Sequence, residues 1–452
     1  MAGTTAVGDA PRARADAPDD DTPGDDTLGD EMRDDTRDPA RAAAIRAAVE
    51  AACSAADAER ARLRAWSIED LRAIARRRLP RAIFEQFDGG AEDEATLRDN
   101  RAAFARRRLM PRVLVDVATV DPSTRLVGGP SALPIAIAPT GAVGFGRHGG
   151  DLMIARAAAR RGIPYALSTS ATASIEQIAE QAGGRLWFQA YVIRDRSFTF
   201  RLIDRARAAG YEAVMITVDL PVGGKRERDF RNDMSIPFRY TARNLLDFAT
   251  HPRWALPMLA KGMPVMENLR GVAPAATSAK GIVSTAGRNY DPSFDWDGLK
   301  AIRDAWPRTL IVKGIVRPDD AARAVAAGVD AIVVSNHGGR QLDGGIATLD
   351  ALPGVLHAVA GRAEVLVDGG VRRGADVVKA LALGARGVLV GRPTLYGTFA
   401  AGQAGALRAL EILEDEVVRT LRLCGARSIA DVGPDLLADD ALPPPPGPDG
   451  AR

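Results

Sequence analysis

The stretch LIVKGIVRPDDAARAVAAGVDAIVVSN, residues 310–336, decides the fold because it contains one complete repeat of the architecture. Two nearly continuous apolar runs, 310–314 and 331–336, flank a segment that has the start and stop residues of a helix. Pro318, followed by two aspartates, is typical of the first turn of a helix, and Gly328 is typical of its end. Strands that are apolar throughout are typical of parallel sheets covered on both faces. The stretch therefore predicts a strand–helix–strand unit.

Runs of the same kind recur along the chain and give eight expected strands, at residues 133–139, 164–169, 186–192, 213–219, 310–314, 331–336, 364–370 and 387–392. Helical patterns separate them. Ser174 and Gln177 have capping-box spacing before one such helix, and Gly183 ends it. Eight β–α units predict an α/β fold of the TIM (β/α)₈ barrel class, whose active site lies at the carboxyl ends of the strands. A doubly wound open sheet is the alternative, although no glycine-rich dinucleotide turn follows the first strand.

The barrel does not require the whole chain of 452 residues. Residues 1–40 carry twelve acidic and four basic residues and almost no large apolar ones, so we expect a disordered acidic tail. We expect a helical lead-in at 41–65, the barrel at 66–437 with an insert at about 231–285, and a flexible proline-rich tail at 438–452.

Composition excludes several classes of protein. Two cysteines are too few for a disulfide framework or a cysteine metal site, which fits a reducing cytoplasm. The N-terminus lacks the apolar core of a secretory signal, and no run of about 18 apolar residues predicts a membrane-spanning helix. The arginine-rich stretch 60–81 contains one aromatic residue, so we do not expect a nucleic-acid site.

Polar residues end all eight expected strands. They include Thr140, Thr169, Gln189, Tyr191, Thr217, Asp219, Lys313, Ser335, His337, Asp368 and Arg392. One such residue is more often a helix cap than a catalyst. Eight strands that all end this way at one face of a barrel predict an active site there.

The residue types at these strand ends suggest different chemical roles. His337 lies in a glycine-rich loop that exposes its imidazole as a general base, and Asp219 is available to orient it. Arg226 and Arg340 have the planar fork that binds a carboxylate. The glycines at the last two strand ends, with Arg392, predict a phosphate site. No two histidines have metal-ligand spacing, so no metal is expected.

Three longer motifs make the sequence recognisable: SNHGGRQLD at 335–343, DGGVRRGADVVKALALGA at 368–385 and GGAEDEATLRDN at 89–100. Over about residues 66–437 the chain resembles the FMN-dependent α-hydroxy acid dehydrogenase family. Stretches such as LWFQAYVI at 186–193 and RERDFRN at 226–232 are most similar to its mandelate- and lactate-oxidising members. The resemblance implies an enzyme that oxidises a small L-2-hydroxy acid to the 2-oxo acid.

The resemblance also implies roles for individual residues. His337 would be the catalytic base and Asp219 its partner, while Tyr191, Arg226 and Arg340 would bind substrate. FMN would contact Pro139, Thr140, Gly141, Thr169, Gln189, Thr217, Lys313 and Ser335, and its phosphate would contact Asp368, Gly369, Gly370, Arg372, Gly391 and Arg392. For Lys313 the alternatives are a cation beside the flavin, which would stabilise its reduced form, and an ion pair in the core.

Two positions suggest a roomy substrate pocket. Gln86 stands where the family usually has a substrate-binding tyrosine, and Gly141 stands where many oxidase members have alanine. Both replacements are expected to make room, which would favour mandelate or branched 2-hydroxy acids over glycolate.

The insert bears on the electron acceptor. It combines aromatic and basic residues, as an interfacial surface does, which favours peripheral contact with the inner face of the cell membrane and a quinone acceptor. An active-site lid is the alternative for the insert. A soluble oxidase that uses O₂, and a non-catalytic flavin-binding protein, are the alternatives for the function. The resemblance further implies a homo-oligomer, specifically a tetramer.

Overall fold

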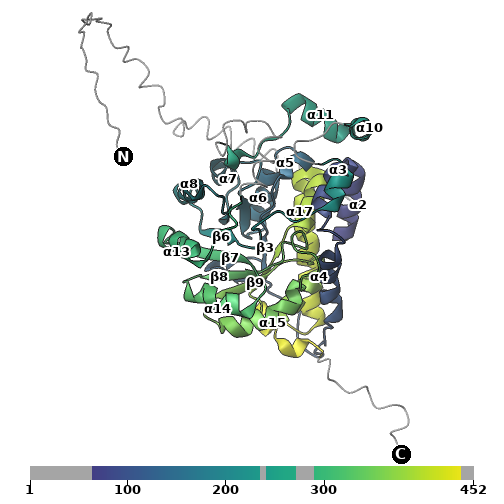
Figure 1. Cartoon of the computed structure of the whole chain (residues 1–452). Coiled ribbons are helices and arrows are strands. Elements are labelled where there is room, and N and C mark those ends of the chain that lie inside the picture. The colour runs from purple at the N-terminus through teal and green to yellow at the C-terminus, as the bar shows by residue number, and fades with distance from the viewer. Residues whose placement is uncertain (1–63, 235–240, 271–289, 439–452) are drawn as a thin grey trace, which may run out of the picture. The chain divides into compact units, whose positions relative to one another are not determined.

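The computed structural model describes residues 64–234, 241–270 and 290–438. The expected tail 1–40, nearly all of the lead-in 41–65, the C-terminal tail beyond residue 438 and two parts of the insert lie outside the described residues. The elements below carry the labels of Figure 1.

Eight parallel strands close into a barrel in the order β10-β3-β4-β5-β6-β7-β8-β9. They are β3 (Ile135–Ile137), β4 (Tyr165–Ser168), β5 (Leu186–Tyr191), β6 (Ala213–Thr217), β7 (Thr309–Ile315), β8 (Ala331–Val334), β9 (Glu364–Val367) and β10 (Gly387–Val390). Each coincides with a predicted run. Because β10 pairs with β3, the sheet has no open edge and the open-sheet alternative is wrong.

A helix follows each strand and covers the outside of the barrel. These helices are α6 (Gly150–Arg160), α7 (Ile175–Gln181), α8 (Arg196–Ala208), α13 (Trp296–Ala305), α14 (Pro318–Ala326), α15 (Thr348–Val359), α16 (Gly374–Ala382) and α17 (Arg392–Leu423). The predicted starts of two helices are confirmed: Ser174 Oγ accepts a hydrogen bond from the backbone N of Gln177, and Pro318 is the first residue of α14.

The remaining elements lie before the barrel and in the insert. The helices α2 (Ile68–Arg78), α3 (Arg81–Asp88) and α4 (Ala95–Arg106) precede β3, and the short α5 (Val143–Gly146) follows it. The insert contributes α9 (Glu227–Arg231), α10 (Ala242–Ala249) and α11 (Pro252–Lys261). In Figure 1, α2 runs beside α17, and α10 and α11 lie next to each other.

The barrel interior is filled by a cluster of fully buried side chains drawn from all eight strands: Ala136, Ala166, Trp187, Ala213, Met215, Ile311, Ala331, Val333, Leu366 and Leu389. A hairpin that the sequence did not predict, β1 (Thr124–Leu126) with β2 (Gly129–Ser131), adds Leu126 and Val127 to this cluster. The hairpin amides of Val127 and Gly128 donate to the carboxylate of Glu364 at the start of β9. The β1–β2 hairpin therefore closes the amino-terminal end of the barrel, opposite the predicted active site.

Candidate active site

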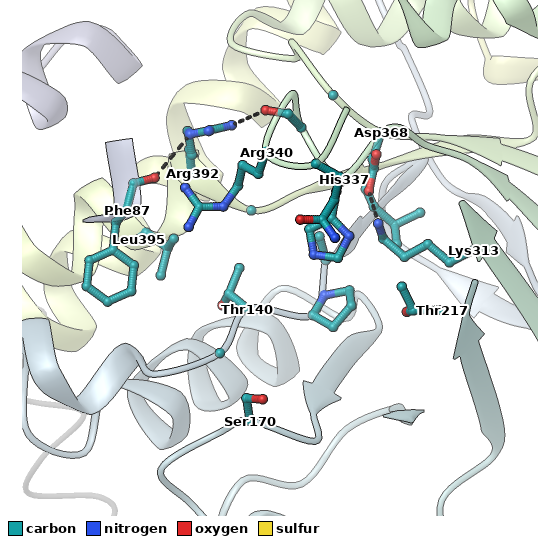
Figure 2. A pocket seen from close by; sticks show the side chains of 18 of the residues that line it. Phe87, Thr140, Ser170, Thr217, Lys313, His337, Arg340, Asp368, Arg392 and Leu395 are labelled. Carbon is teal, nitrogen blue, oxygen red and sulfur yellow. Dashed lines mark hydrogen bonds and ion pairs between the residues drawn. The ribbon is translucent and has the colours of Figure 1, made fainter. Parts of the chain in front are cut away.

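A cavity of about 360 Å³ lies at the carboxyl ends of the strands (Figure 2). Side chains alternate between the two faces of a strand, so residues two positions beyond a barrel-core residue also point inward. Thr217 follows Met215 in this way, and Lys313 follows Ile311. Asp368 likewise lies two positions beyond the core residue Leu366. The active-site side chains are therefore the top layer of the barrel core, in which apolar residues give way to polar ones.

The cavity gathers most of the predicted site residues: Gln86, Pro139, Thr140, Gly141, Tyr191, Thr217, Arg226, Lys313, His337, Arg340, Asp368, Gly369, Gly370, Arg372, Gly391 and Arg392. The other predicted residues lie immediately behind its wall. Thr169 Oγ1 donates to the carbonyl of Gln189 (2.7 Å), and Ser335 Oγ accepts from Lys313 Nζ (2.7 Å). The strand-end polar residues therefore divide into a layer that lines the cavity and a layer that supports it.

His337 is held at both ring nitrogens. Its Nδ1 lies 2.9 Å from Asp219 Oδ1, and its Nε2 lies 3.2 Å from the hydroxyl of Tyr191. Because a carboxylate only accepts, Asp219 fixes the proton on Nδ1 and leaves the Nε2 lone pair facing Tyr191 and the cavity. His337 has φ +58°, so the loop turns sharply at this residue and presents the ring to the cavity. An imidazole held in this way is able to act as a general base with an orienting carboxylate.

Asp219 remains ionised despite its burial. Burial by itself would raise its pKa, but the charge and hydrogen bond of His337, together with Lys313, bring the pKa below its ordinary value. Gly314 makes this position possible, because a Cβ there would lie 2.7 Å from the Cβ of Asp219. A buried negative charge beside the imidazole favours the protonated ring that a base becomes after it has acted.

Lys313 combines the two alternatives that the sequence left open. It forms an ion pair of 3.0 Å with Asp368, and it also lines the cavity. Burial lowers its pKa, but the charges of Asp368 and Asp219 outweigh burial and raise the pKa above its ordinary value. Lys313 is therefore a fixed positive charge in the cavity wall.

Arginines lie on the opposite side of the cavity from Lys313 (Figure 2). Arg340 donates to the backbone carbonyls of Gly89 (2.7 Å) and Gln86 (2.9 Å), and Arg226 Nε donates to Asp229 (2.8 Å). Burial first, and then the charges of Arg226 and Arg392, lower the pKa of Arg340 to about 9. This side of the cavity therefore has an excess of positive charge that an anionic ligand would relieve.

Arg392 lines the cavity, and its predicted contact with a phosphate stays a prediction. All three of its nitrogens donate to backbone carbonyls, those of Phe87, Gly338 and Gly89. Its guanidinium thus joins the residues before α4 to the loop that carries His337, and these bonds use three of its five N–H groups. Backbone amides are also available to a phosphate, since α16 and α17 both begin near residues that line the cavity.

Gly141 differs from its predicted role. A Cβ at this position would lie 2.8 Å from the Cβ of Ser170. The space beside Gly141 is therefore occupied by Ser170, and the glycine permits a close approach. The expectation that it leaves open room is wrong, and the argument for a wide pocket rests on Gln86.

Several residues that line the cavity were not predicted from the sequence. Tyr290, Leu220, Met266 and Leu395 line the cavity, but they belong to no strand end that the pattern marked. The side chains of Asn100 and Asn336 exchange two hydrogen bonds of 2.8 Å. That pair was detectable in principle, since both asparagines belong to the family motifs at 89–100 and 335–343.

The cavity fits a polar heterocyclic cofactor that carries a phosphate. Within the described part of the chain, the buried atoms Thr217 Oγ1, Gln189 Nε2 and Asp368 Oδ1 have no hydrogen-bond partner. Such atoms at a cavity are well suited to a ligand with donors and acceptors along its edge. Gly370 has φ +93°, and a Cβ there would lie 2.3 Å from the Asn100 carbonyl oxygen, so only glycine allows this close backbone turn. Over the described residues, no cluster of histidine, cysteine and acidic side chains is suited to a metal ion.

Comparison with known proteins agrees with this geometry. The family model described as FMN-dependent dehydrogenase matches residues 75–439. The chain is 45% identical to an L-lactate dehydrogenase of Caulobacter vibrioides, over 82% of this chain and 97% of that protein. The solved structure of the monotopic membrane protein (S)-mandelate dehydrogenase superposes with a TM-score of 0.81 at 40% identity, over 84% of this chain and 100% of that one. A mandelate oxidase solved with (S)-4-hydroxymandelic acid gives a TM-score of 0.72 at 39% identity, over 83% and 98% of the two chains.

Proposed function

This chain belongs to the FMN-dependent dehydrogenase family, and from that premise we propose that it oxidises a mandelate- or lactate-like L-2-hydroxy acid and passes the electrons to a quinone. The chain is an FMN-dependent oxidoreductase that acts on α-hydroxy acids. The observation that carries the proposal is the ring of His337, held between Asp219 and Tyr191 and facing a wall of arginines. The non-catalytic alternative has no support from this site.

We assign the chain's residues to three tasks. Arg226 and Arg340 bind the substrate carboxylate, because both line the cavity and their charges lie close enough for Arg226 to lower the pKa of Arg340. Tyr191 places the substrate hydroxyl near Nε2 of His337, which removes one proton while Asp219 stabilises the imidazolium. Bound FMN supplies the two-electron acceptor.

The remaining predicted residues would hold the flavin. Among the residues that the structure describes, Thr217 and Lys313 line the cavity with an unpartnered hydroxyl and a positive charge, and Gln189, with its unpartnered Nε2, lies behind the wall. The cavity is also lined by Pro139, Thr140 and Gly141. Gly369, Gly370, Arg372 and Gly391 surround the site proposed for the phosphate. Purified protein should be yellow and should release FMN on denaturation. Release of FAD, or a protein that takes up no flavin, would contradict this assignment.

Peripheral contact with a membrane is supported by α10 and α11. Leu246 and Leu259 are 69% and 81% exposed, and Leu245 and Leu256 are also exposed. Arg243, Arg253 and Lys261 lie on the same two helices. Apolar and basic side chains together are the composition of an interfacial surface. No helix among the described residues has the length and apolar character needed to cross a membrane.

The inner side of α11 explains how such a surface would be held on the barrel. Trp254 and Met258 of α11 are buried, and Trp254 Nε1 donates to the carbonyl of Phe145 (2.7 Å). One face of α11 is thereby attached to α5, while Leu256 and Leu259 are exposed. This arrangement supports a docking surface for the cytoplasmic face of the cell membrane more than a lid over the active site.

Vesicle binding tests this part of the proposal. Leu259→Glu combined with Leu246→Glu should abolish co-sedimentation with vesicles that contain anionic lipid. Leu423→Glu is the matched control, since Leu423 is 69% exposed on α17 and away from the insert. Equal binding by the double variant and the control would exclude the surface.

The acceptor and substrate are tested by two assays on the same preparation. Anaerobic bleaching of the flavin by a panel of 2-hydroxy acids identifies the substrate. Reoxidation is then followed with a soluble quinone and, separately, with air. Stoichiometric peroxide in air with slow quinone reduction would favour the oxidase alternative, for which the likeness to mandelate oxidase is the specific observation. We further propose a homotetramer, for which the mass in solution is the test.

A further inference from the structure

A second cavity adjoins the active-site cavity. Its volume is about 280 Å³, and it lies between the ends of β5, β6 and β7 and the segment before α13. Four residues line both cavities: Tyr191, Thr217, Leu220 and Tyr290. These shared side chains are the wall between the two spaces. Any substrate too long for the first cavity would meet this wall.

The two tyrosines form most of that wall. Their ring centroids lie 5.2 Å apart with the planes tilted by 54°. Tyr191 is committed to His337 through its hydroxyl. Among the described residues, the ring nitrogens of His337 are hydrogen-bonded to Tyr191 and Asp219, and neither is bonded to Tyr290. Of the two rings, Tyr290 is therefore the one that can vary without disturbing the catalytic base.

The backbone around Tyr290 is firmly attached to the barrel. Tyr290 forms an antiparallel bridge with Ile193, and the amide of Asp291 donates to the carbonyl of Val192 (3.0 Å). The carboxylate of Asp291 pairs with Arg196 at 2.7 Å. The contacts of residues 290 and 291 thus hold the ring next to Tyr191.

The second cavity has a chemistry of its own. Phe294, Trp296, Leu299 and Ile315 supply apolar lining. The charged groups among the described lining residues are carboxylates only, Asp291, Asp295 and Asp320. The cavity therefore suits an apolar chain and disfavours a second carboxylate. The first cavity, with its arginines, has the opposite preference.

We propose that Tyr290 determines the size of substrate that the enzyme accepts, and that the cavity behind it is a subsite for an apolar substrate tail. This inference rests on the proposed function, since it assumes a 2-hydroxy acid whose carboxylate faces Arg226 and Arg340. The tyrosine wall borders the same cavity, so a long side chain of a substrate held there reaches this wall. Removal of the Tyr290 ring joins the two cavities, and longer apolar side chains then enter the second one.

The test measures kcat/KM for a long and a short substrate, 2-hydroxyoctanoate and lactate, in the FMN-loaded enzyme and takes their ratio. Tyr290→Ala should raise this ratio by about fourfold for each CH₂ group that becomes buried, because each is worth about 0.8 kcal/mol. Tyr290→Leu should raise it less. Tyr290→Phe keeps the ring and should leave the ratio near that of the wild type. 2-Hydroxyadipate, which ends in a carboxylate, should gain nothing from Tyr290→Ala.

Phe294→Leu is the matched control, since Phe294 lines only the second cavity and its change leaves the wall in place. An unchanged ratio in Tyr290→Ala and Tyr290→Leu, or an equal rise in Tyr290→Phe, would overturn the inference. Binding of the corresponding 2-oxo acids, measured by calorimetry, gives the same chain-length comparison without turnover. A shift in that binding series with no turnover of any hydroxy acid would mean that the proposed function fails while the assignment of Tyr290 stands.

Discussion

Asp219→Asn is the substitution that separates the catalytic role of the His337 pair from a structural one. It keeps the size of the side chain and removes the negative charge next to the imidazole. The contact between Asp219 Oδ1 and His337 Nδ1 is 2.9 Å, so the two charge centres lie about 4 Å apart when the ring is protonated. At an effective dielectric constant of about 20, that pair is worth about 4 kcal/mol.

The asparagine oxygen retains part of this interaction as a neutral hydrogen bond, so we expect a loss of about 3–4 kcal/mol. A loss of that size slows the proton-removing step by about 10²–10³-fold. The measurement is the rate of anaerobic flavin reduction in a stopped-flow instrument at saturating substrate. The affinity for a non-reactive carboxylate inhibitor should change little, because the arginines that would bind it are unaltered.

Asp295→Asn is the matched control. Asp295 caps α13 by accepting from the backbone N of Gly298 (3.0 Å), and asparagine caps helices equally well. This control also lies near the ends of the strands, but it does not touch His337. If Asp219→Asn reduced its flavin within about threefold of the wild-type rate, the electrostatic role of Asp219 would be wrong.

The remaining predictions concern the base, the carboxylate site, acid stability and substrate size. His337→Gln should retain FMN and lose at least about 10²–10⁴-fold in flavin reduction, and near-normal reduction would mean that another residue is the base. Arg340→Met should raise KM by about 10- to 150-fold, as expected for the loss of a charge-assisted hydrogen bond worth about 1.5–3 kcal/mol. Steady-state kinetics that show an unchanged KM would exclude Arg340 from substrate binding. Burial would raise the pKa of Asp88, but hydrogen bonds from Arg72 and Tyr396 hold it at about 2, below the ordinary 3.8. The lowered pKa stabilises the folded state by about 2 kcal/mol above about pH 4, and this stabilisation is lost as the pH falls toward about 2. Acid denaturation curves of Asp88→Asn should lack this pH-dependent stabilisation. Curves that match those of the wild type would exclude it. Mandelate or a branched 2-hydroxy acid should have a higher kcat/KM than glycolate, and the reverse order would contradict the wide-pocket argument from Gln86.

The barrel was predictable because its signal is local. Each strand is a short apolar run, and each helix has its own start and stop residues, such as Pro318 and Gly328, so neighbouring residues carry the information. The hairpin β1–β2 was not predictable in this way. Its strands have three residues each and no apolar run, and it is stabilised by contacts with Glu364, 237 residues after Val127 in the chain.

The site was predictable for the residues at strand ends and not for the residues that reach it from elsewhere. A barrel brings all its strand ends to one face, so His337, Lys313 and Asp219 could be grouped from their positions alone. Tyr290 reaches the same cavity from the segment after the insert, where no strand end marks it. The predicted contact of Arg392 with a phosphate stays a prediction, and the fold adds a second task for this residue. Sequence shows a cation at a phosphate-type loop, but only the fold shows that backbone carbonyls accept hydrogen bonds from its guanidinium.

The same contacts explain why residue 86 is free to differ from the tyrosine usual in the family. Arg340 donates to the backbone carbonyl of Gln86, and the carbonyl of Gly89 receives bonds from both Arg340 and Arg392. Every residue has a backbone carbonyl, so the position of this segment over the cavity does not depend on which side chain stands at 86. The side chain of Gln86 lines the cavity, and its contact with the substrate stays a prediction. A replacement of Gln86 should change the preference among hydroxy acids while the flavin, the base and the fold remain as they are.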